Sequence, residues 1–171
     1  MIEMELFDPQ ATEQLGVGIA ALMSAGDVVL LVGDLGAGKT TLVRGLVRGL
    51  GGKDEVTSPT FALRHEYATD PPLTHVDCWR LGSTEELDDL GLDEVLDDGG
   101  ALVIEWGRLA ERRFGADALH VSLADGASGT TRVVRLDFRE PRWVDREHRL
   151  SEWLRSCGVV FAVSSSDVSA P

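Results

Sequence analysis

A glycine-rich segment at residues 33–40, with the sequence GDLGAGKT, constrains the fold of this chain more than any other feature. The segment matches the pattern G-x-x-x-x-G-K-[ST] at every fixed position. The apolar run DVVLLV at residues 27–32 precedes it and is typical of a buried parallel strand. Residues 41–50 follow with apolar side chains at helical spacing, and Gly51 ends this pattern. The order of strand, glycine loop and helix predicts an α/β structure built around the loop.

The residue types of this loop predict a site for a nucleoside triphosphate. Gly36 and Gly38 allow the backbone to turn several N–H groups, together with the positive end of the helix dipole, toward one anion. Lys39 is a compact charge on a long stem that suits the β- and γ-phosphates, and the Thr40 hydroxyl suits a magnesium ion that bridges them. The nucleotide contacts are therefore expected from Gly36, Ala37, Gly38, Lys39, Thr40 and Thr41.

Composition excludes several other classes of protein. The 171 residues carry a net charge of −13, so a chain this acidic would be repelled by RNA on its own. No apolar stretch approaches the ~18 residues of a membrane span, and the acidic N-terminus lacks the basic start of a signal peptide. Cys78 and Cys157 lack metal-ligand spacing, which favours reduced thiols and a cytoplasmic location.

The remaining patterns predict a three-layer P-loop NTPase-like sandwich, with a central, mostly parallel sheet, an antiparallel strand pair and flanking helices. The expected elements are a helix from Asp8-Pro9, strands at 61–67 and 73–78, an acidic helix after Ser83, strands at 101–105, 118–123 and 132–138, and a helix from Trp143. The ATPase-type domain is expected to span 1–140, a C-terminal helical extension 141–163, and a disordered tail 164–171.

Two acidic residues are candidates for catalysis. Glu105 ends an apolar strand, and a parallel sheet would place it beside Thr40 as a second magnesium ligand. An ordinary surface glutamate after a core strand is the alternative for this position. Asp77 could act on the attacking water or hold magnesium through a water, while a structural ion pair with Arg80 competes with both roles.

Two further positions have a functional and a plain interpretation. Thr60, in the loop with Ser58 and Pro59, could sense the γ-phosphate as switch loops do, or could belong to a simple turn. Trp106 follows Glu105 and either belongs to the core or stacks near the nucleotide. For Thr60 the two interpretations are equally balanced, whereas for Trp106 the residue type favours the core and the position at a strand end favours the nucleotide.

Five ordered motifs together resemble one family. They are GDLGAGKTT at 33–41, SPTFAL at 58–63, HVDCWRL at 75–81, EELDDLGLDE at 85–94 and VIEW at 103–106. This set resembles the bacterial TsaE (YjeE) family, the ATPases of tRNA threonylcarbamoyladenosine biosynthesis, over about Asp8 to Phe138. Trp79 is one departure, because the family usually has tyrosine there.

The resemblance implies a function and a set of roles. Family members are cytoplasmic ATPases that hydrolyse ATP to reset a TsaD–TsaB complex, which modifies adenosine 37 of tRNAs reading codons that begin with A. Thr40 and Glu105 match the magnesium ligands, Asp77 a carboxylate needed for hydrolysis, and Thr60 the switch-like threonine. Thr12 falls where the family has a nucleotide contact, although the alignment there is loose. The chain would meet tRNA only through its partners, and the acidic segment Glu85–Asp98 becomes a candidate partner-facing patch.

Three rival functions fit the glycine loop. A GTPase is disfavoured, because the chain contains no asparagine for an N-K-x-D loop. A small-molecule kinase could use Arg108, Arg112 and Arg113 as a lid over the phosphates. A nucleotide-dependent adaptor with negligible turnover is the third, and the resemblance favours a blend of ATPase and adaptor with slow intrinsic hydrolysis that partners accelerate.

Overall fold

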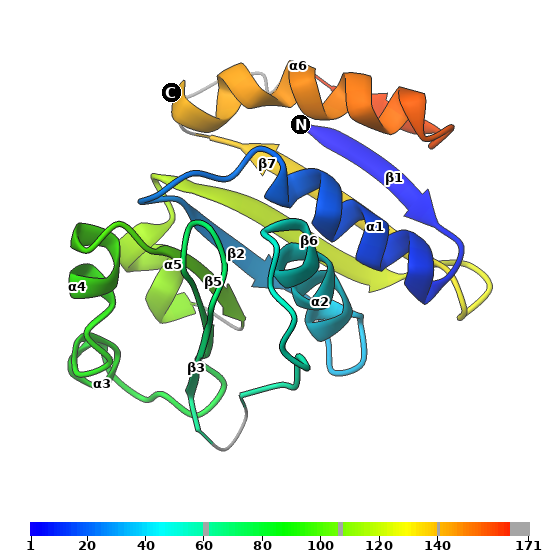
Figure 1. The fold of residues 1–171 in the computed structure, drawn as a ribbon. Coiled ribbons are helices and arrows are strands. Elements are labelled where there is room, and N and C mark those ends of the chain that lie inside the picture. Colours follow the sequence, from blue (N-terminus) through cyan, green and yellow to red (C-terminus); the bar gives the residue numbers. More distant parts are fainter. Residues whose placement is uncertain (60–61, 106–107, 140, 165–171) are drawn as a thin grey trace, which may run out of the picture.

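One mixed sheet organises the chain in the computed structural model, which describes residues 1–59, 62–105, 108–139 and 141–164. Its eight strands follow the order β3-β4-β5-β2-β6-β7-β1-β8 (Figure 1). The strands are β1 (Ile2–Leu6), β2 (Val28–Val32), β3 (Arg64–Tyr67), β4 (Leu73–Asp77), β5 (Ala101–Glu105), β6 (Ala118–Asp125), β7 (Arg132–Phe138) and β8 (Phe161–Val163).

Helices cover both faces of this sheet, so the molecule has three layers (Figure 1). One face packs against α1 (Pro9–Ala20), α2 (Lys39–Gly49) and α6 (Pro141–Ser156). The other face packs against α3 (Thr84–Asp88), α4 (Leu92–Asp97) and α5 (Arg108–Phe114). Among the described residues, no helix combines the length and the apolar character that crossing a membrane requires.

The strands next to the glycine loop are parallel, but the sheet as a whole is not mostly parallel. Strands β4, β5, β2 and β6 form the parallel centre, and β3 pairs antiparallel with β4 as the sequence predicts. On the other side β7, β1 and β8 continue the sheet in antiparallel pairings. The prediction of a mostly parallel sheet is therefore wrong, because both ends of the chain contribute strands that were not expected.

The sequence of strand β1 has the alternating pattern of a strand, although this acidic segment was not predicted as one. Ile2, Met4 and Leu6 are buried, while Glu3 and Glu5 between them are exposed. This alternation with a period of two is the pattern of a strand with one face in the core. Strand β8, only three residues long, then pairs with β1, so the chain beyond the predicted C-terminal helix returns to the sheet.

Helices α1 and α2 meet at a crossing without side chains between them. A Cβ added at Gly16 would stand 2.3 Å from the Leu42 carbonyl oxygen, and one added at Gly45 would stand 2.0 Å from the Glu13 carbonyl oxygen. Only glycine permits so close an approach of the two backbones. The contact holds α2, and with it the glycine loop at its N-terminus, against a long helix of the core.

Helix α6 begins within the predicted extension and anchors itself to the start of β2. Its Trp143 is fully buried, and Arg146 stacks over that ring at 4.8 Å. Arg146 also forms an ion pair with the fully buried Asp27, and the Arg142 guanidinium lies 3.4 Å from the same carboxylate. Asp27 additionally accepts the backbone N–H of Ser24 at 2.6 Å. The extension therefore neutralises a buried charge that directly precedes the central strand.

We expect Arg146→Ala to lower the free energy of unfolding by about 2 kcal/mol, because Asp27 loses a charged partner while it stays buried. Urea denaturation followed by circular dichroism measures this. Arg149→Ala on the same helix is the matched control, since Arg149 is exposed, and it should change stability by less than about 0.5 kcal/mol. Equal effects of the two substitutions would contradict the anchoring role of Asp27.

Candidate functional site

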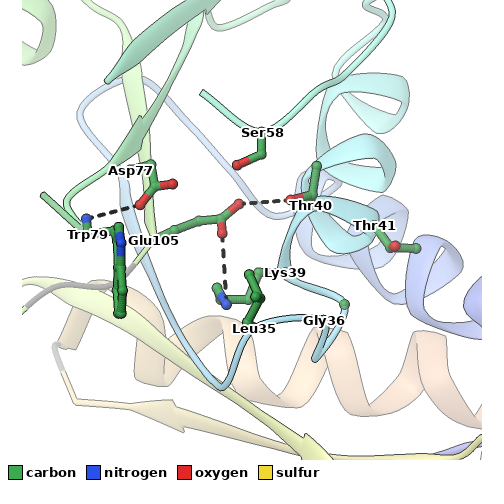
Figure 2. Close-up of a pocket in the computed structure, with 10 residues that line it drawn as sticks. Leu35, Gly36, Lys39, Thr40, Thr41, Ser58, Asp77, Trp79 and Glu105 are labelled. Atoms are coloured by element: carbon green, nitrogen blue, oxygen red, sulfur yellow. Dashed lines mark hydrogen bonds and ion pairs between the residues drawn. The ribbon is translucent and has the colours of Figure 1, made fainter. Parts of the chain in front are cut away.

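A cavity of about 530 Å³ opens where the parallel strands end and helix α2 begins. Strands β4 and β5 deliver Asp77 and Glu105 to its wall, because their carboxyl ends meet at the same edge of the sheet (Figure 2). The lining residues are Leu35, Gly36, Gly38, Lys39, Thr40, Thr41, Ser58, Asp77, Trp79 and Glu105. Such crevices at the carboxyl ends of parallel strands are the usual ligand sites of α/β proteins.

The glycine loop takes a backbone path that requires glycine. Gly36 has a φ of 81°, and Gly38, the residue that caps the N-terminus of α2, has a φ of 103°. Both values lie in the left-handed region that a side chain disfavours. Because α2 starts directly after Gly38, the N–H groups and the positive dipole end of its first turn lie at the cavity, as an anion site requires.

Lys39 is the buried cation of this cavity, with 4% of its surface exposed. Its Nζ donates to the carbonyl oxygens of Gly33 at 2.9 Å and Asp34 at 3.0 Å. The same Nζ lies 4.0 Å from Glu105 Oε2 (Figure 2). Burial lowers the pKa of Lys39, against the opposing effect of the carboxylates of Glu105, Asp77 and Asp34. The Lys39 ammonium group is thus held by two neutral carbonyl groups and by the Glu105 carboxylate, which lies at the limit of ion-pair distance.

Glu105 is the centre of a buried hydrogen-bond cluster. Its Oε1 accepts the Thr40 hydroxyl at 3.3 Å and lies 2.9 Å from His75 Nε2. In the parallel sheet Glu105 is in register with Leu31 of β2, and the glycine loop begins two residues after Leu31. The predicted meeting of Thr40 and Glu105 is therefore found, and two oxygen donors suited to a hard cation lie side by side.

Asp77 occupies the neighbouring strand end and is in register with Glu105. It is 4% exposed, and its Oδ1 accepts the backbone N–H of Trp79 at 3.0 Å (Figure 2). This bond fixes the turn that follows β4 and directs the carboxylate along the cavity wall. The structure thus brings both predicted carboxylates to one cavity together with Lys39 and Thr40.

Two of the residues predicted to contact the nucleotide, Ala37 and Thr12, do not line the cavity. Ala37 is 3% exposed and belongs to the core, so its side chain does not line the cavity. Thr12 is buried behind the loop, where its methyl group would touch a Cβ on Gly38 at 3.7 Å, and its hydroxyl donates to the Asp8 carbonyl oxygen at 3.4 Å. The predictions for Thr60 and Trp106 lie outside the described residues.

Arg113, one of the three arginines of the kinase alternative, is paired away from the cavity. Arg113 forms an ion pair with Asp93 of α4. Neither Arg112 nor Arg113 is among the residues that line the cavity.

Sequence reasoning missed four residues at or behind this cavity. Leu35, 93% exposed, and Trp79, 63% exposed, are large apolar side chains at its rim, and Ser58 lines it (Figure 2). Behind the loop, the Arg132 guanidinium donates to the carbonyl oxygens of Ala37 at 3.1 Å and Gly36 at 3.2 Å. Because Trp79 lies two residues after the candidate Asp77, its place near the cavity could have been predicted. Arg132 lies in the distant strand β7, and no local pattern connects it with the loop.

Cys78, which follows Asp77, is expected to be chemically inert in the folded protein. Burial, and to a smaller extent the charge of Asp77, raises its pKa to about 12. At pH 8 only about one such thiol in ten thousand is ionised, and the thiolate is the reactive form. We therefore expect a thiol reagent at pH 8 to modify the exposed Cys157 alone in the native protein. Cys157→Ser should leave no fast-reacting thiol, and rapid reaction of that variant would contradict the burial of Cys78.

Comparisons with known proteins agree on one family. The family model described as "Threonylcarbamoyl adenosine biosynthesis protein TsaE" matches residues 6–134. A Streptomyces coelicolor protein named tRNA threonylcarbamoyladenosine biosynthesis protein TsaE is 44% identical over 126 residues, covering 71% of this chain and 84% of the relative. A Bacillus subtilis protein of the same name is 40% identical over 115 residues, covering 67% of this chain and 72% of the relative.

A solved structure shares the fold of this chain. The crystal structure of Bacillus subtilis YdiB superposes with a TM-score of 0.76 at 29% sequence identity, covering 90% of this chain and 97% of YdiB. The family match includes the glycine loop, Asp77 and Glu105, and it ends within β7, before helix α6. On the match to the family model and to the named relatives, this chain belongs to the TsaE family.

Proposed function

We propose that the chain is a magnesium-dependent ATPase of tRNA threonylcarbamoyladenosine biosynthesis. In this proposal it binds and hydrolyses ATP to drive or reset a complex of the TsaD and TsaB proteins, while the transfer to adenosine 37 belongs to that complex. Membership of the TsaE family supports the pathway. The cavity at the N-terminus of α2 supports the nucleotide chemistry.

One observation carries the ATPase proposal. Lys39, Thr40 and Glu105 come from two distant parts of the chain and converge in one cavity, with the Thr40 hydroxyl 3.3 Å from Glu105 Oε1. Burying a charge is costly to the fold, and buried charges gathered in a cleft therefore mark candidate functional sites. This cluster places a cation and a carboxylate, with 4% of each side chain exposed, at the N-terminus of a helix. A triphosphate with its divalent cation matches these charges.

Each residue has a role in this proposal that its geometry fits. The N–H groups of the loop and of the first turn of α2 would hold the phosphates, and Lys39 would exchange its carbonyl partners for phosphate oxygens. Thr40 and Glu105 would hold magnesium, which supplies neutralisation of the charge that develops on the transferred phosphate. Asp77, one strand from Glu105, would orient the attacking water.

The charge of the protein agrees with indirect contact to tRNA. A net charge of −13 disfavours binding to the phosphate backbone, so the basic surface would come from the partners. The acidic helices α3 and α4, with Glu85, Glu86, Asp93 and Glu94 in their first turns, offer a surface for such partners.

Calorimetry with Mg-ATP and phosphate release in the presence of TsaD and TsaB test the proposal together. We expect saturable binding of Mg-ATP, slow release of phosphate by the chain alone, and faster release with the partners. GTP as the preferred ligand, or a phosphorylated acceptor in place of free phosphate, would instead support a GTPase or a kinase. Absence of Mg-ATP binding, alone and with the partners, would refute the proposal.

A further inference from the structure

His75 is fully buried, and the proposed function does not assign it a role. It lies in β4, two residues before Asp77, with 0% of its surface exposed. Its Nε2 is 2.9 Å from Glu105 Oε1, the same oxygen that accepts the Thr40 hydroxyl. The ring also stacks on Tyr67 of β3, with centroids 6.4 Å apart and an interplanar angle of 28°. The imidazole is thus fixed against one oxygen of the carboxylate.

The other ring nitrogen indicates which tautomer is present. Nδ1 of His75 is buried and has no hydrogen-bond partner among the residues that the structure describes. A hydrogen on Nδ1 would be a buried donor without an acceptor, which is costly. A hydrogen on Nε2, in contrast, has the Glu105 carboxylate as its acceptor. The geometry therefore favours the tautomer in which His75 donates from Nε2 to Glu105.

We propose that His75 is a positioning residue, which holds the Glu105 carboxylate in the orientation needed to bind magnesium beside Thr40. This inference rests on the proposed function, in which Thr40 and Glu105 hold the ion. Carboxylate ligands are commonly oriented by such an outer hydrogen bond, and loss of the bond typically weakens metal affinity about 10- to 100-fold. Glu105 needs this support because its neighbour Lys39 lies 4.0 Å from the other oxygen, Oε2, and would draw the carboxylate toward itself.

The test separates magnesium affinity from ATP affinity. ATP binding to the full-length chain is measured by calorimetry at a series of Mg²⁺ concentrations. For His75→Leu, which removes the donor but keeps an apolar volume, we expect the half-saturating Mg²⁺ concentration to rise at least about 10-fold. At saturating Mg²⁺ the variant should regain the wild-type ATP affinity. His75→Gln, whose amide can donate from a position near that of Nε2, should restore most of the wild-type Mg²⁺ dependence.

A second histidine provides the matched control. His120 in β6 is also buried, but its Nε2 bonds to the carbonyl oxygen of Gly115 at 2.7 Å, and it does not line the cavity. His120→Leu should lower the melting temperature and leave the Mg²⁺ dependence unchanged. If both leucine variants shifted the Mg²⁺ dependence alike, the effect would come from general loosening of the core and the positioning role would be overturned.

The remaining outcomes are decisive as well. A folded His75→Leu with a wild-type Mg²⁺ dependence would overturn the positioning role while leaving the proposed function intact. Wild-type protein without any Mg²⁺-dependent ATP binding would overturn both. If His75→Leu does not fold, His75→Asn replaces it, because its shorter amide stops before Glu105. We then expect the Gln variant, but not the Asn variant, to retain the Mg²⁺ dependence, and equal retention by both would overturn the proposal.

Discussion

Lys39→Ala is expected to weaken Mg-ATP binding by at least about 100-fold, the scale of removing one partner from a buried charge pair. The substitution removes the buried cation of the cavity, whereas the carboxylates of Glu105 and Asp77 remain there and repel phosphate. Calorimetry of the purified variant measures the loss. Lys53→Ala is the matched control, because Lys53 is the only other lysine of the chain and is exposed. Binding by Lys39→Ala at wild-type strength would remove the main support for the proposed site.

The pKa of Lys39 leads to a second prediction, which concerns the pH dependence of Mg-ATP binding. Burial lowers the pKa of Lys39, so the empty site loses its positive charge at a lower pH than an ordinary lysine does. Phosphate binds the protonated form, so binding raises this pKa again and is accompanied by proton uptake when the pH is near it. We therefore expect the wild-type affinity for Mg-ATP to fall as the pH rises through the Lys39 pKa. The residual binding of Lys39→Ala should lack this decline.

Glu105→Gln is expected to lower the partner-stimulated release of phosphate by about 100-fold or more, the scale of losing a metal-based stabilisation of several kcal/mol. Glutamine keeps an oxygen that can accept from Thr40 and His75, but it lacks the negative charge that strengthens the binding of a divalent cation. ATP binding should persist at high nucleotide concentration, because Lys39 and the loop are unchanged. Phosphate release in the presence of TsaD and TsaB is the measurement.

A surface carboxylate is the control for this substitution. Glu111 in α5 pairs with Arg139 and His120, outside the residues that line the cavity. Glu111→Gln should leave phosphate release at the wild-type rate. A folded Glu105→Gln that turned over as fast as wild type in the partner complex would show that Glu105 is not a magnesium ligand.

Local patterns predicted the elements that build the site. The apolar run before the glycine loop is β2, the helical spacing after it is α2, and Ser83 caps α3 by accepting the backbone N–H of Glu86 at 3.3 Å. The pairing of β3 with β4 was predicted as well. These features were accessible because strand alternation, helical spacing and caps depend on residues only a few positions apart.

Strands β1 and β8 were missed for two different reasons. Strand β1 alternates between buried Ile2, Met4 and Leu6 and two exposed glutamates, and its acidic charge had been interpreted only as evidence against a signal peptide. Strand β8 is three residues long with partly exposed side chains, too short for any periodicity to identify it. Its pairing with β1 depends on where α6 ends against the sheet, which no local pattern encodes.

The sequence by itself determined the glycine loop, the residue types suited to phosphate and magnesium, and the placement of Asp77 and Glu105 at strand ends. Those features are encoded over short stretches, where backbone freedom and charge act directly. Only the tertiary structure decided that His75 contacts Glu105, that Arg132 holds the back of the loop, that Trp79 and Leu35 form the rim, and that Asp27 is neutralised by α6. Each of these contacts depends on strand order and register, which are set by the packing of the whole core.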